Sequence, residues 1–397
     1  MEQIKRTHTC GDLRKSDDGK TVILNGWVHR IREHGGITFI NLRDRYGITQ
    51  VVVDSDATSS LLDTAKALRM EFCIAVEGIV RARPDSMINK DMTTGEIELV
   101  AKDIEILSKS DVLPFMIDEV QKDGTPVIPN EDLRLKYRYL DLRTSKMQHN
   151  IILRSKVAFA TREYLTEQGF LEIETPTFIK STPEGARDYL VPSRVHPGTF
   201  YSLPQSPQLY KQILMVSGFD KYFQIARCYR DEDARGDRQP EFTQIDMELS
   251  FTNREEVLSV TEGMMQHIFK KTLNYDLPAK FDRLSWTEAF DLYGSDKPDL
   301  RFDLKMQDAA FMADLSDFVA FKAGAANADS TLPRHKRSGL KALVVKNVAD
   351  KYSRKMIEAL ESKAKLYKAK GLAWMKVNQE GIFEGGISKF YAGKEAE

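Results

Sequence analysis

Cysteine is scarce in this chain of 397 residues. Its three cysteines, Cys10, Cys73 and Cys228, lie far apart and form no CxxC pair. This argues against a disulfide framework or a cysteine zinc site, and it favours reduced thiols and a cytoplasmic location.

Long apolar runs are also missing. No stretch reaches the roughly 18 consecutive apolar residues that a membrane helix needs. Residues 1–6 are not followed by the apolar segment of a signal peptide. We therefore expect no membrane partner.

The chain has no excess of either charge. Lys and Arg total 58, Asp and Glu total 59, and the formal net charge is −1. A protein that coats DNA through overall positive charge is therefore not expected, although a local basic face remains open. With 42% apolar and 29% charged residues, the length predicts two or three folded domains.

Residues 21–107 alternate apolar and polar side chains in short runs. The runs typical of strands cover 21–32, 37–42, 48–54, 71–83 and 95–107. Leucines at helical spacing predict one helix over 57–70. Three strands, a helix and two more strands are the order of a five-stranded OB-fold β-barrel.

The second and third strands of such a barrel commonly bind oligonucleotides. Residues 27–45 contain four arginines against only Glu33 and Asp44. The residues typical of an RNA-binding face are Arg30, Arg32, Phe39, Arg43 and Arg45. A solvated strand with a core phenylalanine would have the same composition, so this window alone leaves both interpretations open.

Residues 108–144 are rich in proline, glycine and polar residues and predict a linker. Its end, 134–143, is dense in Arg, Tyr and Leu. This fits either a short structured hinge that contacts both domains or a nucleic acid, or an ordinary amphipathic hinge. A long helix is expected over about 145–168, with Gly169 at its end. A strand over 170–175 then ends at Pro176.

The segment 222–251 predicts two antiparallel strands joined by a polar loop over 233–239. On the second strand the polar face carries Phe242, Gln244, Asp246, Glu248 and Ser250. The opposite, core-facing side carries Ile245, Met247, Leu249 and Phe251. On the first strand one face carries Gln224, Cys228, Arg230 and Glu232.

Three residues of this polar face suit a nucleotide and an amino-bearing substrate. A guanidinium such as that of Arg230 can fork onto a phosphate, and Phe242 can stack on a base. Asp246 can hold an ammonium group. An ordinary solvated sheet face remains the alternative on these residues alone.

Longer strings in this region resemble a known family. Tyr229–Glu232 and Arg238–Asp246 are similar to motif 2 of the class II aminoacyl-tRNA synthetases, and 145–178 is similar to motif 1. An OB-fold ahead of these motifs resembles subclass IIb. The strings TPEGARDY (182–189) and QSPQLYK (205–211) resemble the bacterial aspartyl enzymes of that subclass.

The resemblance implies an α+β chain with an OB-fold barrel followed by an antiparallel-sheet catalytic domain. The implied domains are an anticodon-binding OB domain over 1–107, a linker over 108–144, a catalytic domain over 145–292 and part of a bacterial insertion domain over 293–397. Motif 1 implies a homodimer. The implied partners are tRNA(Asp), L-aspartate and ATP, with tRNA(Asn) as a further possible acceptor.

The resemblance also implies roles for single residues. Aspartate would be bound by Glu184, Ser206, Gln208, Lys211, Arg230 and Asp246. ATP would be bound by Arg230, which is also the implied catalytic residue, with Asp231, Glu232, Gln239 and Phe242. Mg²⁺ would be held by Glu248. The anticodon would be bound by Arg30, Arg32, Phe39 and Gln50.

The implied reaction has two steps. The aspartate α-carboxylate attacks the α-phosphorus of ATP, which gives aspartyl-adenylate and pyrophosphate, and a ribose hydroxyl at the tRNA 3′ end then takes the aspartyl group. Neither step needs a protein nucleophile, so positioning and charge neutralisation are expected to carry the rate.

Class II enzymes have a third motif, a glycine-rich strand and helix with an arginine for ATP. Past residue 251 we find none, because 381–386 (GIFEGG) is not followed by an arginine-bearing helix. The chain therefore resembles the N-terminal two-thirds of a longer enzyme. A tRNA-binding fragment without catalysis is the alternative, and a generic single-strand-binding OB protein would leave 222–251 unexplained.

Overall fold

The structure is a computed structural model that describes residues 5–121, 123–182, 184–326, 339–369 and 371–394. The chain separates into two compact units, Met1–Pro278 and Ala279–Glu397, which are described one by one. None of the helices in these described ranges is both long and apolar enough to cross a membrane.

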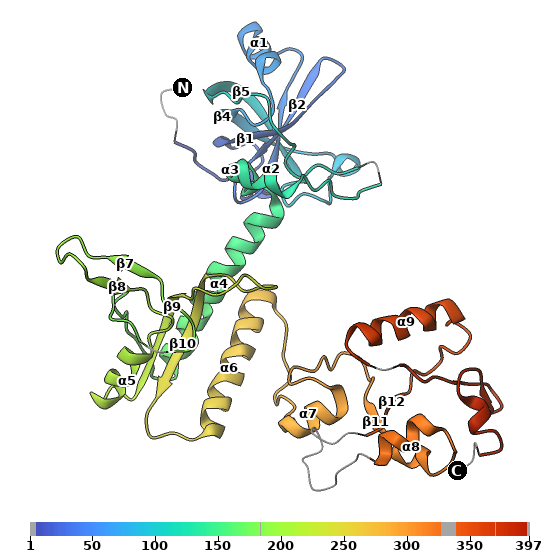
Figure 1. Cartoon of the computed structure of the whole chain (residues 1–397). Helices are drawn as coiled ribbons and strands as arrows, with labels where there is room; N and C mark the ends of the chain where they lie inside the picture. The colour runs from blue at the N-terminus through green and yellow to red at the C-terminus, as the bar shows by residue number, and fades with distance from the viewer. Residues whose placement is uncertain (1–4, 122, 183, 327–338, 370, 395–397) are drawn as a thin grey trace. The chain divides into compact units, whose positions relative to one another are not determined.

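The first unit begins with the expected five-stranded barrel. Its elements are β1 (Thr21–His34), β2 (Ile37–Arg43), β3 (Ile48–Val53), α1 (Ser59–Ala67), β4 (Cys73–Ala82) and β5 (Ile97–Ser108). The strands close in the order β1-β2-β3-β5-β4, and only the β3–β5 pairing is parallel (Figure 1). Alternate residues on each strand point inward, which is why the sequence alternates.

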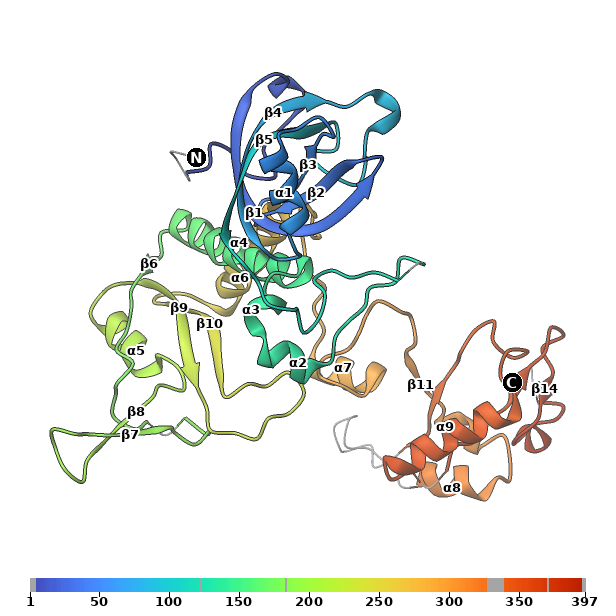
Figure 2. The same ribbon diagram turned by 90° about the horizontal axis from the view of Figure 1, so that it is seen from above.

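The apolar residues of the barrel form one continuous core. Leu24, Ile40, Val51, Ile74 and Leu99 each come from a different strand and are completely buried. They belong to one cluster that α1 covers with Leu61 and Ala65. The closed barrel leaves only its outer face for ligands (Figure 2).

The segment after the barrel is ordered. It contains α2 (Glu131–Lys136) and the single turn α3 (Arg138–Asp141). Phe115, Ile117 and Leu140 form a small core of their own beside Tyr137. The expected linker is therefore a compact hinge with its own packing.

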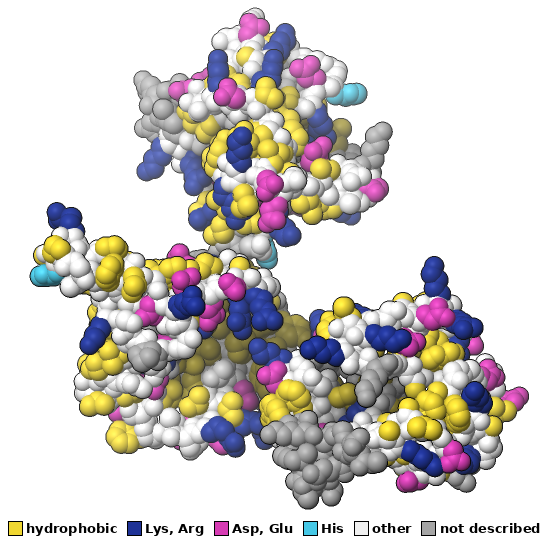
Figure 3. All heavy atoms as spheres, viewed as in Figure 1, with side chains coloured by type: hydrophobic (Ala, Val, Ile, Leu, Met, Phe, Trp, Pro, Cys, Tyr) yellow, Lys and Arg dark blue, Asp and Glu magenta, His cyan; other side chains and the backbone are white. Residues whose placement is uncertain are grey.

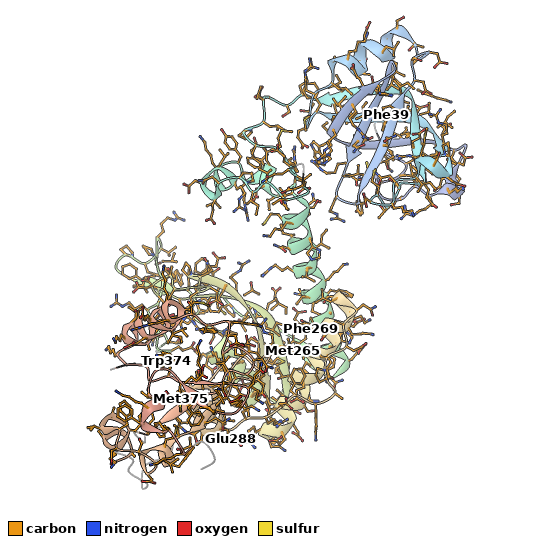
Figure 4. The ribbon with its side chains drawn as sticks, turned by 90° about the vertical axis from the view of Figure 1, so that its right-hand side faces the viewer. Phe39, Met265, Phe269, Glu288, Trp374 and Met375 are labelled. Carbon is orange, nitrogen blue, oxygen red and sulfur yellow. The ribbon has the colours of Figure 1, made fainter. Side chains whose placement is uncertain are left out.

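The expected long helix is α4 (Ser145–Glu167), and Gly169 follows it with φ of +80°. Its C-terminal half packs against α6 (Arg254–Leu273) around a core that includes Leu165, Phe223 and Ile268. Met265 and Phe269 of α6 lie one turn apart (Figure 4). The strand expected over 170–175 is shorter, because only β6 (Leu171–Glu172) pairs with a neighbour.

The sheet of this half has the order β10-β9-β6. Its long hairpin is β9 (Lys221–Tyr229) and β10 (Glu241–Leu249), which pair antiparallel over their whole length. Beside it lie α5 (Gln208–Val216) and the small hairpin of β7 (Leu190–Pro192) and β8 (Phe200–Ser202).

One part of the expected core face of β10 is wrong. Met247 and Leu249 do pack on the core shared with α4 and α6. Ile245 is partly exposed, and Phe251 is 99% exposed. Phe251 has φ of +52° and lies beyond the end of β10, so the strand alternation no longer applies to it.

The second unit contains short elements. They are α7 (Trp286–Tyr293), β11 (Met306–Asp308), α8 (Val319–Ala326), β12 (Lys341–Leu343), α9 (Arg354–Leu366), β13 (Lys376–Val377) and β14 (Phe383–Glu384). The glycine-rich stretch 381–386 belongs to the β13–β14 hairpin. A Cβ at Gly386 would lie 1.8 Å from the carbonyl oxygen of Trp374, so this glycine serves close packing here; Trp374 is labelled in Figure 4.

Candidate functional site

The β9–β10 hairpin presents one polar face, as the alternation predicts. Phe242 lies opposite Cys228, Asp246 opposite Gln224, and Glu248 opposite Tyr222. Residues directly opposite each other on antiparallel strands point to the same side. The aromatic ring and the two carboxylates therefore share a face.

A lysine from α5 reaches the two carboxylates of this face. The Nζ of Lys211 lies 2.9 Å from Asp246 Oδ1 and 3.2 Å from Glu248 Oε2. Lys211 and Asp246 are nearly buried, while the side chain of Glu248 is about a third exposed. Two anions around one cation leave a net charge of −1 on this group.

The cluster keeps Lys211 protonated. Burial alone would lower the pKa of Lys211, but the hydrogen bond and charge of Asp246, followed by those of Glu248, outweigh burial and raise the pKa above its usual 10.5. Asp246 also has a buried oxygen, Oδ2, with no hydrogen-bond partner among the described residues. A second cation beside Asp246 would satisfy that oxygen.

A loop before α5 lies next to this group and is held by Gln205. The buried amide of Gln205 donates to the carbonyl oxygen of Ala186 at 2.9 Å and accepts from the Ala186 backbone N–H at 3.1 Å. Ser206 donates its hydroxyl to Glu184 Oε2 at 2.9 Å. The structure thus brings together Glu184 and Ser206, two of the residues expected to bind aspartate. The two hydrogen bonds between Gln205 and the backbone of Ala186 were not predicted from the sequence.

Arg230 lies at the end of the same face. Its guanidinium carbon is 5.1 Å from the centre of the Phe242 ring, within range of a cation–π contact. Its backbone N–H donates to the carbonyl oxygen of Pro240, which closes the loop between the strands. The loop residues 231–240 are all exposed, including Asp231, Glu232 and Gln239.

Gln208 begins α5, one turn before Lys211, and is partly buried.

The thiol of Cys228 is not a nucleophile at this site. Burial, and after it the charge of Asp246, raise the pKa of Cys228 to about 11. The Cys228 Sγ instead donates to Gln244 Oε1 at 3.1 Å. Pro183 of the string 182–189 lies outside the described residues.

No group of three His, Cys, Asp or Glu side chains in the described ranges is arranged to hold a metal ion. The expected ligand Glu248 has one oxygen on Lys211. Magnesium bound together with nucleotide phosphates needs only one or two protein carboxylates. The half-buried carboxylate of Glu248 fits that lesser requirement.

The barrel brings together the four residues expected to contact RNA. Arg30 and Arg32 pair with Asn41 and Phe39 across β1 and β2, and Gln50 pairs with Asn41 across β2 and β3, so all four point to the outer face. Arg32 donates to Gln50 Oε1 at 3.4 Å. Phe39, labelled in Figure 4, is partly exposed.

Two residues of this face were missed because they come from later strands. Glu98 on β5 accepts from Gln50 Nε2 at 3.1 Å, which fixes the direction of the Gln50 amide. Arg83, just past β4, lies 3.8 Å from Glu98 and has buried nitrogens without hydrogen-bond partners among the described residues. Only the closure of the barrel brings 81–98 beside 30–50, so sequence spacing gave no signal.

One arginine of the expected RNA-binding face, Arg43, does not lie on that face. Arg43 is buried and bonded to His29 and Glu71, so it does not reach the outer surface. Arg45 is exposed at the β2–β3 turn, where it donates to Tyr46.

Comparison with known proteins decides the family. The family model "tRNA synthetases class II (D, K and N)" matches residues 130–376, and the model "OB-fold nucleic acid binding domain" matches residues 22–107. The chain belongs to the family of class II tRNA synthetases (D, K and N). The barrel lies within the residues that the OB-fold model matches, and the β9–β10 hairpin lies within those that the synthetase model matches.

Curated relatives of this synthetase carry the name aspartate–tRNA(Asp/Asn) ligase. The protein of Treponema denticola is 67% identical over the whole chain, and that of Treponema pallidum (strain Nichols) is 53% identical over the whole chain. The chain spans 65% and 63% of the lengths of these two relatives.

Solved structures of the family have a similar fold. The asparaginyl-tRNA synthetase of Pyrococcus horikoshii in complex with asparaginyl-adenylate is 25% identical, with a TM-score of 0.59 over 68% of this chain and 59% of that one. The aspartyl-tRNA synthetase of Entamoeba histolytica is also 25% identical, with a TM-score of 0.58 over 72% of this chain and 62% of that one.

Proposed function

We propose that this synthetase activates L-aspartate with ATP and transfers it to tRNA(Asp) and tRNA(Asn). The observation that carries the proposal is the cluster of Lys211, Asp246 and Glu248 on the hairpin face. Its charges complement an amino acid that has one ammonium and an additional carboxylate. The names of the close relatives favour a ligase over a fragment that only binds tRNA.

Aspartate has three charged groups, and the site offers a partner to each. Its ammonium group would bind Asp246, whose buried Oδ2 has an open acceptor position, with Gln208 nearby. Its side-chain carboxylate would bind Lys211. Its α-carboxylate would then lie toward Arg230, and Glu184 with Ser206 would close over the amino acid.

Lys211 would also supply selectivity. Asparagine has the shape of aspartate but no charge on its side chain, so it would take the place of Asp246 and Glu248 beside Lys211 without supplying an anion in their stead. Leaving one partner of a buried ion pair uncompensated costs about 3–5 kcal/mol. This is the kind of rejection that a pocket built for a polar group achieves.

ATP would lie along the outer end of the face. Phe242 would stack on the adenine, and Arg230 would bind the α-phosphate, where negative charge grows as the aspartate carboxylate attacks. Glu232, Asp231 and Gln239 would contact the nucleotide from the exposed loop, which can close over it. Mg²⁺, when bound with ATP, would neutralise phosphate charge, with Glu248 as its protein ligand.

The barrel would read the anticodon. Phe39 would stack on an unpaired base, and Gln50, oriented by Glu98, would hydrogen-bond to a base edge. Arg30 and Arg32 would bind the backbone phosphates.

The activation step is tested by ATP–pyrophosphate exchange. In protein prepared at the full length of the relatives, exchange should require L-aspartate. Equal stimulation by asparagine or lysine would refute the substrate assignment. Steep salt-dependent tRNA binding without any exchange would support the binding-only alternative.

Phe39→Ala is expected to weaken binding of an anticodon stem-loop of tRNA(Asp) by about 1–3 kcal/mol, because one base loses its stacking partner. Filter binding or fluorescence anisotropy at fixed salt measures the change. Phe311→Ala, an exposed phenylalanine of the second unit, is the control and should leave the affinity unchanged. Equal affinity of Phe39→Ala and the unaltered protein would remove Phe39 from the RNA-binding face.

We further propose that the synthetase is a homodimer that pairs through α4 and its surroundings. Ile151 and Phe159 of α4 are exposed, the latter by 69%, and Phe178 and Leu171 nearby in sequence are also exposed. The β7–β8 arm adds hydrophobic side chains to the visible surface (Figure 3). Exposed apolar side chains in such number mark an interface.

Phe159→Glu should therefore shift the protein toward monomers, because a buried glutamate at a dimer interface has no partner. Analytical ultracentrifugation over a concentration series measures an expected rise in the dimer dissociation constant of at least about tenfold. Ser60→Glu, on the exposed side of α1, is the control. An unchanged dimer would place the interface elsewhere.

A further inference from the structure

A buried carboxylate, that of Glu71, joins the barrel to the hinge. Its Oε2 accepts from Arg43 Nη2 at 2.9 Å and from Arg143 Nη1 at 2.8 Å. The side chain of Glu71 is only 2% exposed, and that of Arg43 only 6%. Arg43 ends β2 of the barrel, whereas Arg143 directly precedes the N-cap of α4.

We propose that Glu71 and Arg143 are positioning residues that set the orientation of the anticodon-binding barrel relative to α4, so that one tRNA can contact both halves of the first unit. This inference rests on the proposed function. Neither residue is placed in contact with the reacting atoms, and neither belongs to the motifs that indicated the family.

Two side chains of the first unit, Glu71 and Trp27, contact the guanidinium group of Arg143. Besides its bond to Glu71, its guanidinium carbon lies 4.7 Å from the centre of the Trp27 ring. Trp27 of β1 pairs directly with Arg43 of β2. The stacking and the ion pair therefore fix both the position and the plane of the guanidinium.

Glu71 has an unusual backbone conformation at this place. Its φ is +61°, which is rare for a residue other than glycine, asparagine or aspartate. Its backbone N–H donates to the carbonyl oxygen of Val28 at 2.7 Å, and its carboxylate is buried. Strained backbone of this kind persists where the surrounding structure requires it.

Hydrogen bonds also join the hinge to the start of α4. Thr144 caps the N-terminus of α4, and the backbone N–H and hydroxyl of Ser145 both donate to the carboxylate of Asp118. Asp118 follows Ile117 of the small hinge core. Arg143 is thus connected to α4 by ordered backbone and side-chain bonds, and α4 packs on the core below the hairpin.

The barrel side of the network lies on the strands that carry the RNA-binding face. The β1–β2 ladder that pairs Trp27 with Arg43 continues to the pair of Arg32 with Phe39. Arg43 also contacts His29 Nδ1 at 2.8 Å, which ties both strands to the network. An anticodon bound to this face would be held at a defined position relative to α4.

Arg143→Met is the variant of choice, because it leaves the buried Glu71–Arg43 pair intact. Whole tRNA(Asp) should bind about tenfold more weakly, since two surfaces held in a fixed geometry bind one ligand more tightly than two loosely connected ones. An anticodon stem-loop, which needs only the barrel, should bind within about twofold of the unaltered protein. Lys136→Met removes one positive charge from the same hinge and should affect neither RNA.

Glu71→Gln alters the pair with Arg43 as well as the bond to Arg143, and it should also weaken whole tRNA more than the stem-loop. Adding Arg143→Met to Glu71→Gln should weaken whole tRNA little further, because the Glu71–Arg143 ion pair is already lost. Equal weakening of whole tRNA and stem-loop would mean that the network only folds the barrel, and would overturn the proposal. Unchanged binding of both RNAs would overturn it as well.

A readout without RNA separates this proposal from the proposed function. Spin labels at Asp63 of α1 and Lys156 of α4, both exposed, report the distance between the barrel and α4. Arg143→Met should broaden that distance distribution, and Lys136→Met should not. If the unaltered protein bound no tRNA, the proposed function would fail, while an unchanged distribution in Arg143→Met would separately overturn the role of the network.

Discussion

Replacement of Lys211 by alanine is expected to lower kcat/KM for aspartate in ATP–pyrophosphate exchange by about 10³-fold, with ATP binding nearly unchanged. A thousandfold loss corresponds to about 4 kcal/mol, which lies within the cost of leaving one partner of a buried ion pair uncompensated. In the proposed complex that partner is the side-chain carboxylate of aspartate.

The variant also leaves Asp246 and Glu248 without their cation, so folding must be measured separately. Lys211→Met keeps most of the side-chain volume and should show the same kinetic loss. Lys221→Ala, an exposed lysine at the start of β9, is the control. Unchanged dependence on aspartate in a folded Lys211→Met protein would refute the role given to Lys211.

The pH profile provides a second check on this lysine. Because its pKa is raised above the usual value of 10.5, Lys211 stays charged throughout the neutral and mildly alkaline range. Its contribution to aspartate affinity is present below that value and should be lost only as the pH rises past it. A fall in aspartate affinity between about pH 7 and pH 9 would require another titrating group.

The elements near the site could be predicted because their patterns are local. Alternation with a period of two gave both the barrel strands and the shared face of Phe242, Asp246 and Glu248, since strand geometry alone determines which side chains point together. The helix of motif 1 followed from apolar periodicity and from Gly169 at its end.

The errors and omissions share a cause, which is that burial and long-range pairing are not local. Arg43 was expected on the RNA-binding face, but the turn that carries Glu71 brings a buried carboxylate to it from 28 positions away. Glu98 and Gln50 are 48 positions apart and meet only because the barrel closes. Gln205 lies inside a string that was noticed, yet only the fold shows that its amide holds the loop at Ala186.

The sequence also left the meaning of the lysine cluster open. The string QSPQLYK contains Gln208 and Lys211, but nothing local shows that this segment forms a helix that packs beside β10. The structure shows Lys211 paired with Asp246 and Glu248. Binding of aspartate would therefore replace internal ion pairs with pairs to the substrate, which limits the cost of holding a buried charge in the free protein.

Arg230→Ala is expected to have the other large effect, a loss of about 10³-fold or more in the rate of aspartyl-adenylate formation. The positive charge of Arg230 would neutralise the α-phosphate as the carboxylate attacks, and arginines that stabilise phosphoryl-transfer transition states contribute about 10³–10⁵-fold. The single-turnover rate of aspartyl-adenylate formation, measured at saturating ATP and aspartate, isolates this step from binding.

Arg227→Ala is the matched control, because Arg227 lies on the same strand but belongs to the opposite face, where it pairs with Glu241 at 2.9 Å. Arg230→Lys keeps the charge but loses the planar fork, so it should recover only part of the rate. If Arg230→Ala and Arg227→Ala slowed aspartyl-adenylate formation by the same factor, both effects would reflect the stability of the hairpin. Adenine would stack on Phe242, whereas Arg230 would act where charge grows on the α-phosphate, so Arg230→Ala should weaken ATP binding far less than it slows the chemical step.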